Sequence, residues 1–169
     1  MEMATALDAP VERLDLHEQN FVSKVREHGW FCTNVFAEED SPGFSYSTGF
    51  WLDLGYPEIV VFSLDSKVAH SVLWDVYRDV KGGKAFPIDR RIPDLFGNTD
   101  AFLFPVAETH FPHYLGWSRW FYGTSGFRCL QLVWPDKSGL FPWEPGADPA
   151  FAKSQPDLSE EGWGSCGQA

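Results

Sequence analysis

Residues 44–64 carry the clearest pattern of apolar and polar positions in the chain. In the first part, 44–50, large side chains such as Tyr46 alternate with small ones such as Ser47. Side chains on a β-strand point alternately to opposite faces, so this alternation predicts a strand with one large and one small face. Residues 59–64 are almost wholly apolar, which is typical of a strand buried on both faces. We therefore expect two neighbouring strands at the centre of a sheet.

Two segments predict helices that pack on this sheet. Asp15, followed by Glu18 three positions later, has the pattern of a capping box, and the helix that it starts would end at Gly29. Residues 66–80 have apolar side chains at spacings of three and four, including Val68. Ser66 is the expected cap of this second helix.

The other segments are shorter and less regular, and together they define the expected fold class. We expect an α+β fold with a single, mostly antiparallel, curled sheet that is half-open and similar to a split barrel. The Pro- and Trp-rich segment after Val133 would wrap over this body. The further expected elements are strands at 30–36, 84–86, 101–107 and 127–134, a short aromatic helix or turn at 114–122, and a loop at 90–100 that turns at Gly97-Asn98.

Length and charge narrow the class of protein. A chain of 169 residues fits one domain. We expect a flexible N-terminal arm at 1–13, the domain at 14–158 and a disordered tail at 159–169. The net charge of −11 disfavours nucleic acid and anionic membranes as partners and suits docking onto a basic protein. No leader segment and no run of about 18 apolar residues is visible, so we expect a cytoplasmic protein.

The cysteines offer little chemistry. Cys32, Cys129 and Cys166 are far apart, so neither a disulfide framework nor a zinc site is indicated. The first two lie in apolar strands, where thiols are usually inert. The Trp134-Pro135-Asp136 segment is similar to the acid loop of tyrosine phosphatases, but neither of these cysteines has the required arginine six positions later. Asp136 is therefore expected to cap the turn that ends the last strand.

Glu108, His110 and His113 form the one metal-like pattern that we consider. Two histidines three positions apart with a carboxylate are able to bind a metal, but Pro112 breaks the helical geometry of an HExxH site. The alternative is a surface loop whose histidines bond locally. No glycine-rich nucleotide motif is present, so the expectation is a protein without a metal or cofactor.

Several blocks resemble a bacterial family known as domain of unknown function 4262. They are REHGW at 26–30, FSYSTGF at 44–50, GYPEIVVFSL at 55–64, LQLVWPDKSGLFPWEPG at 130–146 and QPDL at 155–158. Where the family usually has YTVGL, this chain has YSTGF. The resemblance implies a small, mostly stand-alone bacterial protein, and it implies no activity.

A looser, architectural likeness connects the chain with split-barrel flavin-binding proteins. By analogy, the hydroxyls of Ser45, Ser47 and Thr48, together with Ser66 and Lys67, would hold an FMN phosphate. Because such barrels are often dimers, the likeness to split-barrel proteins also implies that this chain could form a homodimer.

Two functions remain open from the sequence. The first is a non-enzymatic domain that binds a protein or small-molecule ligand, including an immunity-like role against a basic toxin. Its aromatic cleft would lie between the strand from Tyr46 and the turn from Trp134 to Trp143, with Asp136 nearby. The alternative is a flavin-binding protein or flavin-dependent enzyme.

Overall fold

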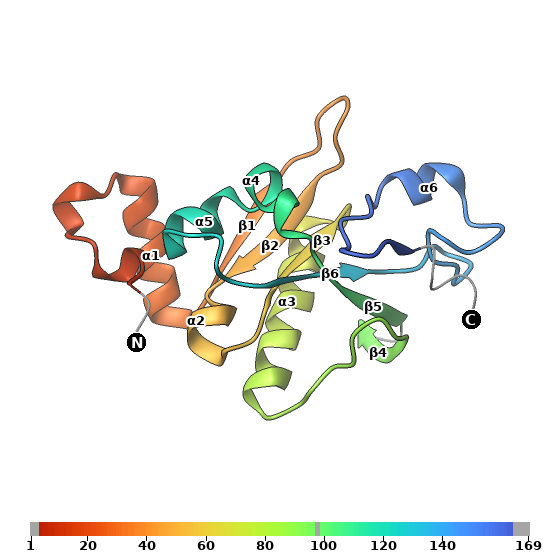
Figure 1. Cartoon of the computed structure of the whole chain (residues 1–169), viewed down its shortest axis with the longest axis horizontal. Helices are drawn as coiled ribbons and strands as arrows, with labels where there is room; N and C mark the ends of the chain where they lie inside the picture. Colours follow the sequence, from red (N-terminus) through yellow and green to blue (C-terminus); the bar gives the residue numbers. More distant parts are fainter. Residues whose placement is uncertain (1–3, 97–98, 164–169) are drawn as a thin grey trace.

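The computed structural model describes residues 4–96 and 99–163, which form an open six-stranded sheet with helices on both faces (Figure 1). The elements are η1 (Ala6–Asp8), η2 (Val11–Arg13), α1 (Leu16–His28), β1 (Phe31–Val35), β2 (Phe44–Thr48), α2 (Phe50–Leu54), β3 (Glu58–Phe62), α3 (Ser66–Lys81), β4 (Ile92–Phe96), β5 (Thr99–Pro105), η3 (Glu108–His110), α4 (Phe111–Tyr114), α5 (Gly116–Tyr122), β6 (Cys129–Val133) and α6 (Pro149–Lys153).

The strand order is β1-β2-β3-β6-β5-β4. β3 and β6 are parallel, and the other neighbouring strands are antiparallel. The α+β class with a mostly antiparallel sheet is therefore confirmed, while the sheet does not close into a barrel. None of the helices in the described ranges has the length and apolar character needed to span a bilayer.

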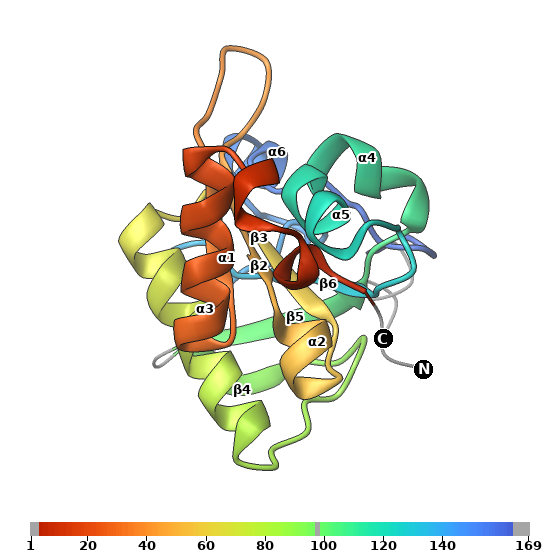
Figure 2. The same ribbon diagram turned by 90° about the vertical axis from the view of Figure 1, so that its left-hand side faces the viewer.

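The two faces of the sheet are covered by different helices (Figure 2). α3 packs on one face, where its apolar stripe meets Ile59 and Val61 of β3. α1, α4 and α5 cover the other face, where Phe21 and Phe121 meet Val60. β3 is thus buried on both faces, as the apolar composition of residues 59–64 predicts, although the strand ends at Phe62.

Local signals place the two long helices correctly. Asp15 and Glu18 form the expected capping box, and α1 ends at Gly29 in the left-handed conformation. α3 has the expected span, but its cap is Asp65, whose carboxylate accepts from Lys67 N at 2.9 Å. Val68, expected to face inward, is 42% exposed because the buried stripe of α3 begins at the next residue.

Three expected local conformations differ from the structure. The loop after β2 contains the short helix α2, which follows Gly49. The loop expected at 90–100 contains β4, which is stabilised by pairing with β5. Residues 84–86 form no strand. The turn expected at Gly97-Asn98 lies outside the described residues.

The segment after β6 returns over the sheet, as its Pro- and Trp-rich composition predicts. Gln131 of β6 holds it: Nε2 donates to Pro156 O at 2.6 Å, and Oε1 accepts from Leu158 N at 3.1 Å. Part of the expected disordered tail is ordered, since Ser159 pairs with Val106. Residues 164–169 of that tail lie outside the described residues.

The expected flexible arm also has structure in its described part. Residues 4–13 form the 3₁₀ turns η1 and η2, and Thr5 caps the first of them. Leu7 packs against the α1 side of the sheet, and its carbonyl accepts from Arg26. The arm is therefore held against the domain by apolar and polar contacts.

Candidate functional site

Glu58, the first residue of β3, is a fully buried carboxylate held by five hydrogen-bond donors. Three of them are the backbone N–H groups at the start of α2, so Glu58 caps that helix from a distance. The donors are Ser47 Oγ at 2.8 Å and Phe50 N at 3.1 Å to Oε1, and Gly49 N at 3.0 Å, Trp51 N at 3.1 Å and Tyr122 Oη to Oε2.

Burial dominates the ionisation of this group and raises the pKa of Glu58 to about 7. The hydrogen bonds from Tyr122, Trp51, Ser47 and Gly49 act in the opposite direction. Because both oxygens are fully engaged inside the protein, this cluster joins β2, β3, α2 and α5 and offers no free acceptor to a substrate. Glu58 is a structural carboxylate.

The candidate side chains on β2 are also buried and hydrogen-bonded within the protein. Tyr46, Ser47 and Thr48 are buried, together with Ser45. Their hydroxyls bond within the protein, so those proposed for an FMN phosphate already have partners. Tyr46 Oη accepts from Trp117 N at 3.0 Å, Thr48 Oγ1 lies 2.7 Å from Ser118 Oγ, and Ser45 Oγ donates to Asn34 Oδ1 at 2.7 Å.

Ser66 and Lys67 lie elsewhere, at the exposed start of α3. They line a groove of about 620 Å³ beside β1, between α1 and α3, which we name the β1 groove. The structure therefore does not bring them together with the buried hydroxyls of β2. The groove is also lined by Lys24, His28, Trp30, His70 and Trp74.

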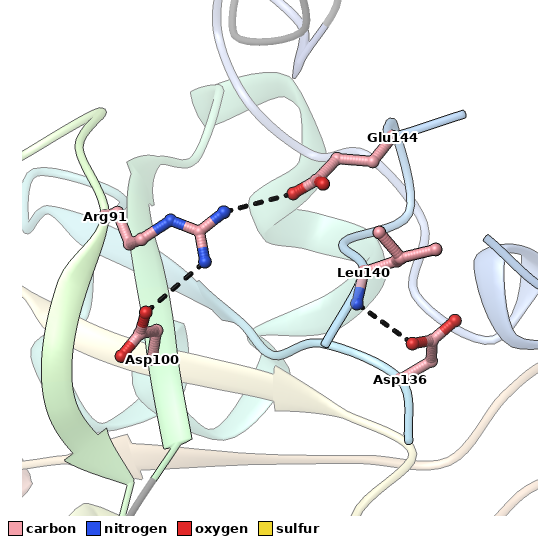
Figure 3. Close-up of polar contacts among 5 residues, drawn as sticks. All are labelled: Arg91, Asp100, Asp136, Leu140 and Glu144. Atoms are coloured by element: carbon pink, nitrogen blue, oxygen red, sulfur yellow. Dashed lines mark hydrogen bonds and ion pairs between the residues drawn. The ribbon is translucent and has the colours of Figure 1, made fainter. Parts of the chain in front are cut away.

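Trp134 and Asp136 follow β6 and have internal partners too. Trp134 Nε1 donates to Phe62 O at 2.9 Å. Asp136 Oδ1 accepts from Ser138 N at 2.8 Å and from Leu140 N at 2.9 Å (Figure 3), which confirms the turn cap. The bond from Leu140 is the main cause that lowers the pKa of Asp136. Trp134 packs with the cluster on the α3 side of the sheet, whereas Tyr46 belongs to the cluster on the opposite face, so the sheet separates the two expected sides of the cleft.

Trp143 lines a different pocket, which we name the C-terminal notch. It has a volume of about 760 Å³ and lies where the end of the described chain crosses β5. Its lining combines aromatic residues with carboxylates. The notch is defined by Phe102, Phe104, Trp143, Asp89, Glu160 and Glu161.

Arg91 also lines the C-terminal notch and is held between Asp100 and Glu144 (Figure 3). Its guanidinium lies 3.3 Å from Asp100 Oδ2 and 3.2 Å from Glu144 Oε1. The guanidinium carbon is also 5.0 Å from the ring centre of Phe141 and 5.9 Å from that of Phe102. This combination of carboxylates and ring faces is the usual environment of a bound organic cation.

The notch is also lined by Asp89, Glu160 and Glu161. Burial and then the charges of Glu161 and Glu160 raise the pKa of Asp89, so the three carboxylates are close enough to repel one another. Arg90 lines the pocket as well, and its side chain is in no ion pair among the described residues. A cation placed among these carboxylates would relieve their repulsion.

The structure provides neither a metal-binding cluster nor a reactive thiol among the described residues. Within residues 4–96 and 99–163, no three His, Cys, Asp or Glu side chains gather in a way that could hold a metal ion, and this includes Glu108, His110 and His113. Burial raises the pKa of Cys32 to about 12 and that of Cys129 well above its ordinary value, so both thiols stay protonated.

Comparison with known proteins establishes the family. The family model described as domain of unknown function (DUF4262) matches residues 24–148. The chain belongs to this family. The search of curated proteins gave no match, and the search of solved structures gave none either. The matched DUF4262 region contains Glu58, Tyr122 and Arg91, while Glu160 and Glu161 of the notch lie beyond it.

Glu58 and Arg91 are not among the residues that the sequence patterns indicate. Glu58 directly precedes the apolar run at 59–64, and that position is a usable signal because a charge at the start of a buried strand needs buried partners. Arg91 had no comparable signal, since its partners Asp100 and Glu144 are distant in the sequence.

Proposed function

We propose that this DUF4262 protein is a non-enzymatic binding domain that takes a cationic group of a basic protein in its C-terminal notch. The observation that carries this proposal is the way Arg91 is held. It is paired with two carboxylates, and it stacks near two aromatic rings. The protein thus already binds one cation of its own at this surface.

The rest of the notch offers the same chemistry to a group from outside. The half-buried Trp143 supplies ring surface, and Asp89, Glu160 and Glu161 supply negative charge. Arginine and lysine side chains are bound favourably where aromatic faces and carboxylates meet. A basic segment of a partner protein fits this description better than a neutral or anionic ligand.

The net charge of the whole protein also favours a basic partner. A net charge of −11 attracts a basic partner over distances longer than a contact and speeds its association at low salt. An immunity-like role, in which the protein neutralises a basic toxin, is one form of this proposal.

A flavin role has weaker support. The hydroxyls of Ser45, Ser47 and Thr48 are buried and bonded internally, so an FMN phosphate would have to displace existing partners. Ser66 and Lys67 lie at a separate surface. We therefore favour the binding domain over the flavin alternative.

The test is a titration of the protein with a fluorescent hexa-arginine peptide at low salt, followed by fluorescence anisotropy. The variant Glu160→Gln with Glu161→Gln removes two charges from the notch and should weaken binding about tenfold. Glu12→Gln with Asp75→Asn removes two charges from exposed positions elsewhere and should change the affinity less than about threefold.

Equal losses in the two double variants would mean that only the overall charge attracts the peptide, and would refute a site in the notch. Absence of saturable binding by the wild-type protein at low salt would refute the proposal as well.

A further inference from the structure

We propose that two copies of this chain associate by antiparallel pairing of their β1 strands. β1 is an edge strand: among the described residues it pairs with β2 alone, so its outer side presents N–H and C=O groups without a strand partner. Edge strands usually carry lysine, proline or a bulge that discourages pairing. β1 has the sequence FCTNV, and its register against β2 is continuous.

The outer edge of β1 is accessible. The β1 groove runs along it between α1 and α3, and its lining includes Phe31, Cys32 and Asn34 from the strand itself. Neighbouring residues of a strand point to opposite faces, so a groove that touches both Phe31 and Cys32 wraps around the edge. An added strand has room there.

The hairpin that follows β1 supplies an arm. Residues 36–43 join β1 to β2 and project beyond the body of the molecule (Figure 1). Phe36, directly after β1, is 83% exposed. Glu38, Glu39 and Asp40 at the tip are exposed too, and the tip is closed by a bridge between Glu38 and Ser41. The arm therefore presents an uncovered aromatic ring next to three negative charges.

The charges of arm and groove are complementary in the antiparallel arrangement. The end of one β1 then lies beside the start of the other, and each arm extends past the start of the opposite strand. That start follows the C-terminal half of α1, which carries Lys24 and His28 of the groove lining. Glu27, which lies 3.8 Å from Lys24 Nζ and 3.7 Å from His28 Nε2, is the exposed carboxylate that the arm must compete with.

The same arrangement covers the exposed apolar surface. The arm brings Phe36 of one copy to the groove of the other, where the half-buried Trp74 forms part of the wall. A two-fold axis makes each contact twice, and it makes the two sheets continuous. The C-terminal notch lies near β5, separated from β1 by β2, β3 and β6, so this inference is independent of the proposed function.

The test is light scattering of the wild-type protein after gel filtration at about 100 µM and low salt. We expect a mass of twice 19.1 kDa. Hydrogen exchange should also slow at residues 31–35 as the protein concentration rises, because the outer amides of β1 become bonded only in the dimer.

Charge reversal in the arm provides the specific variant. Glu38→Lys with Glu39→Lys should weaken dimerisation at least about tenfold, and Lys24→Glu should do the same. Combining the three substitutions should restore most of the affinity, because the attraction is rebuilt with opposite signs. Glu160→Lys with Glu161→Lys makes the same charge change in the notch and should leave the dimer intact.

Three results would overturn the inference. The first is a wild-type mass of 19.1 kDa at about 100 µM. The second is an equal loss of dimer in the arm variant and the notch variant. The third is failure of the combined substitutions to restore association.

Discussion

The Tyr122→Phe substitution tests the cluster around Glu58 with the smallest change of shape. Tyr122 Oη donates to Glu58 Oε2 and accepts from Gly49 N at 3.1 Å and Leu52 N at 3.3 Å. Removing the oxygen leaves the ring, which packs against Phe127. The substitution therefore deletes one charge-assisted hydrogen bond and one acceptor.

The magnitude follows from these contacts. A hydrogen bond to a charged group contributes about 1.5–3 kcal/mol, and leaving a partly buried N–H without an acceptor costs about 1 kcal/mol more. Gly49 N keeps Glu58 as its partner, so only Leu52 N loses its acceptor. We expect the free energy of unfolding to fall by about 3 kcal/mol.

The cost should depend on pH. The bond from Tyr122 lowers the pKa of Glu58, so its loss raises that pKa further above about 7. A raised carboxyl pKa gives stability that is complete below the unfolded pKa and is lost as the pH rises through the folded one. Without Tyr122 Oη, this loss continues to higher pH. The cost of Tyr122→Phe should therefore be larger at about pH 8 than at about pH 5.

Urea unfolding followed by tryptophan fluorescence measures both effects. Tyr56→Phe is the matched control, because the Tyr56 hydroxyl is buried without a hydrogen-bond partner among the described residues. Its removal should be neutral or slightly stabilising. The reasoning is refuted if Tyr122→Phe costs no more than Tyr56→Phe, or if its cost is the same at the two pH values.

Three further predictions concern stability. Because burial raises the pKa of Glu58 from 4.5 to about 7, this group alone should lower the free energy of unfolding by about 3 kcal/mol between these pH values, and urea titrations showing stability constant or rising with pH would contradict it. Gly49→Ala should destabilise by at least about 3 kcal/mol in thermal or urea unfolding, since φ is +124° and the new Cβ would lie 2.3 Å from Gly29 O. Gly55→Ala, where no atom lies within 4 Å of the new Cβ, should cost much less. Gln131→Ala removes two bonds to the C-terminal segment, so amide exchange there should accelerate while that of α1 is unchanged.

The sequence predicts those elements whose stabilising contacts are local. The capping box of α1 lies within four residues, and the stripe of α3 repeats within one helix. α2 was expected as a loop because its cap, Glu58, comes from the following strand. β4 was missed for the same reason, since pairing with β5 depends on the tertiary fold.

In the candidate site, too, contacts between neighbours in the sequence are predictable and contacts between distant residues are not. Asp136 bonds to N–H groups two and four residues away, so its role as a turn cap is predictable from the sequence. The C-terminal notch is built by Asp89, Trp143 and Glu160, which are far apart along the chain. Composition indicates surplus aromatic and acidic residues, but only the fold determines which of them meet.

The position of β6 has a consequence for how the protein is made. β6 lies between β3 and β5, so it is the strand that joins the N-terminal half of the sheet to β5 and β4. A nascent chain that has not yet released residues 129–133 from the ribosome holds two separate pieces of sheet, each with an open edge. During synthesis, protection from aggregation should therefore be acquired late and abruptly, when this one strand inserts.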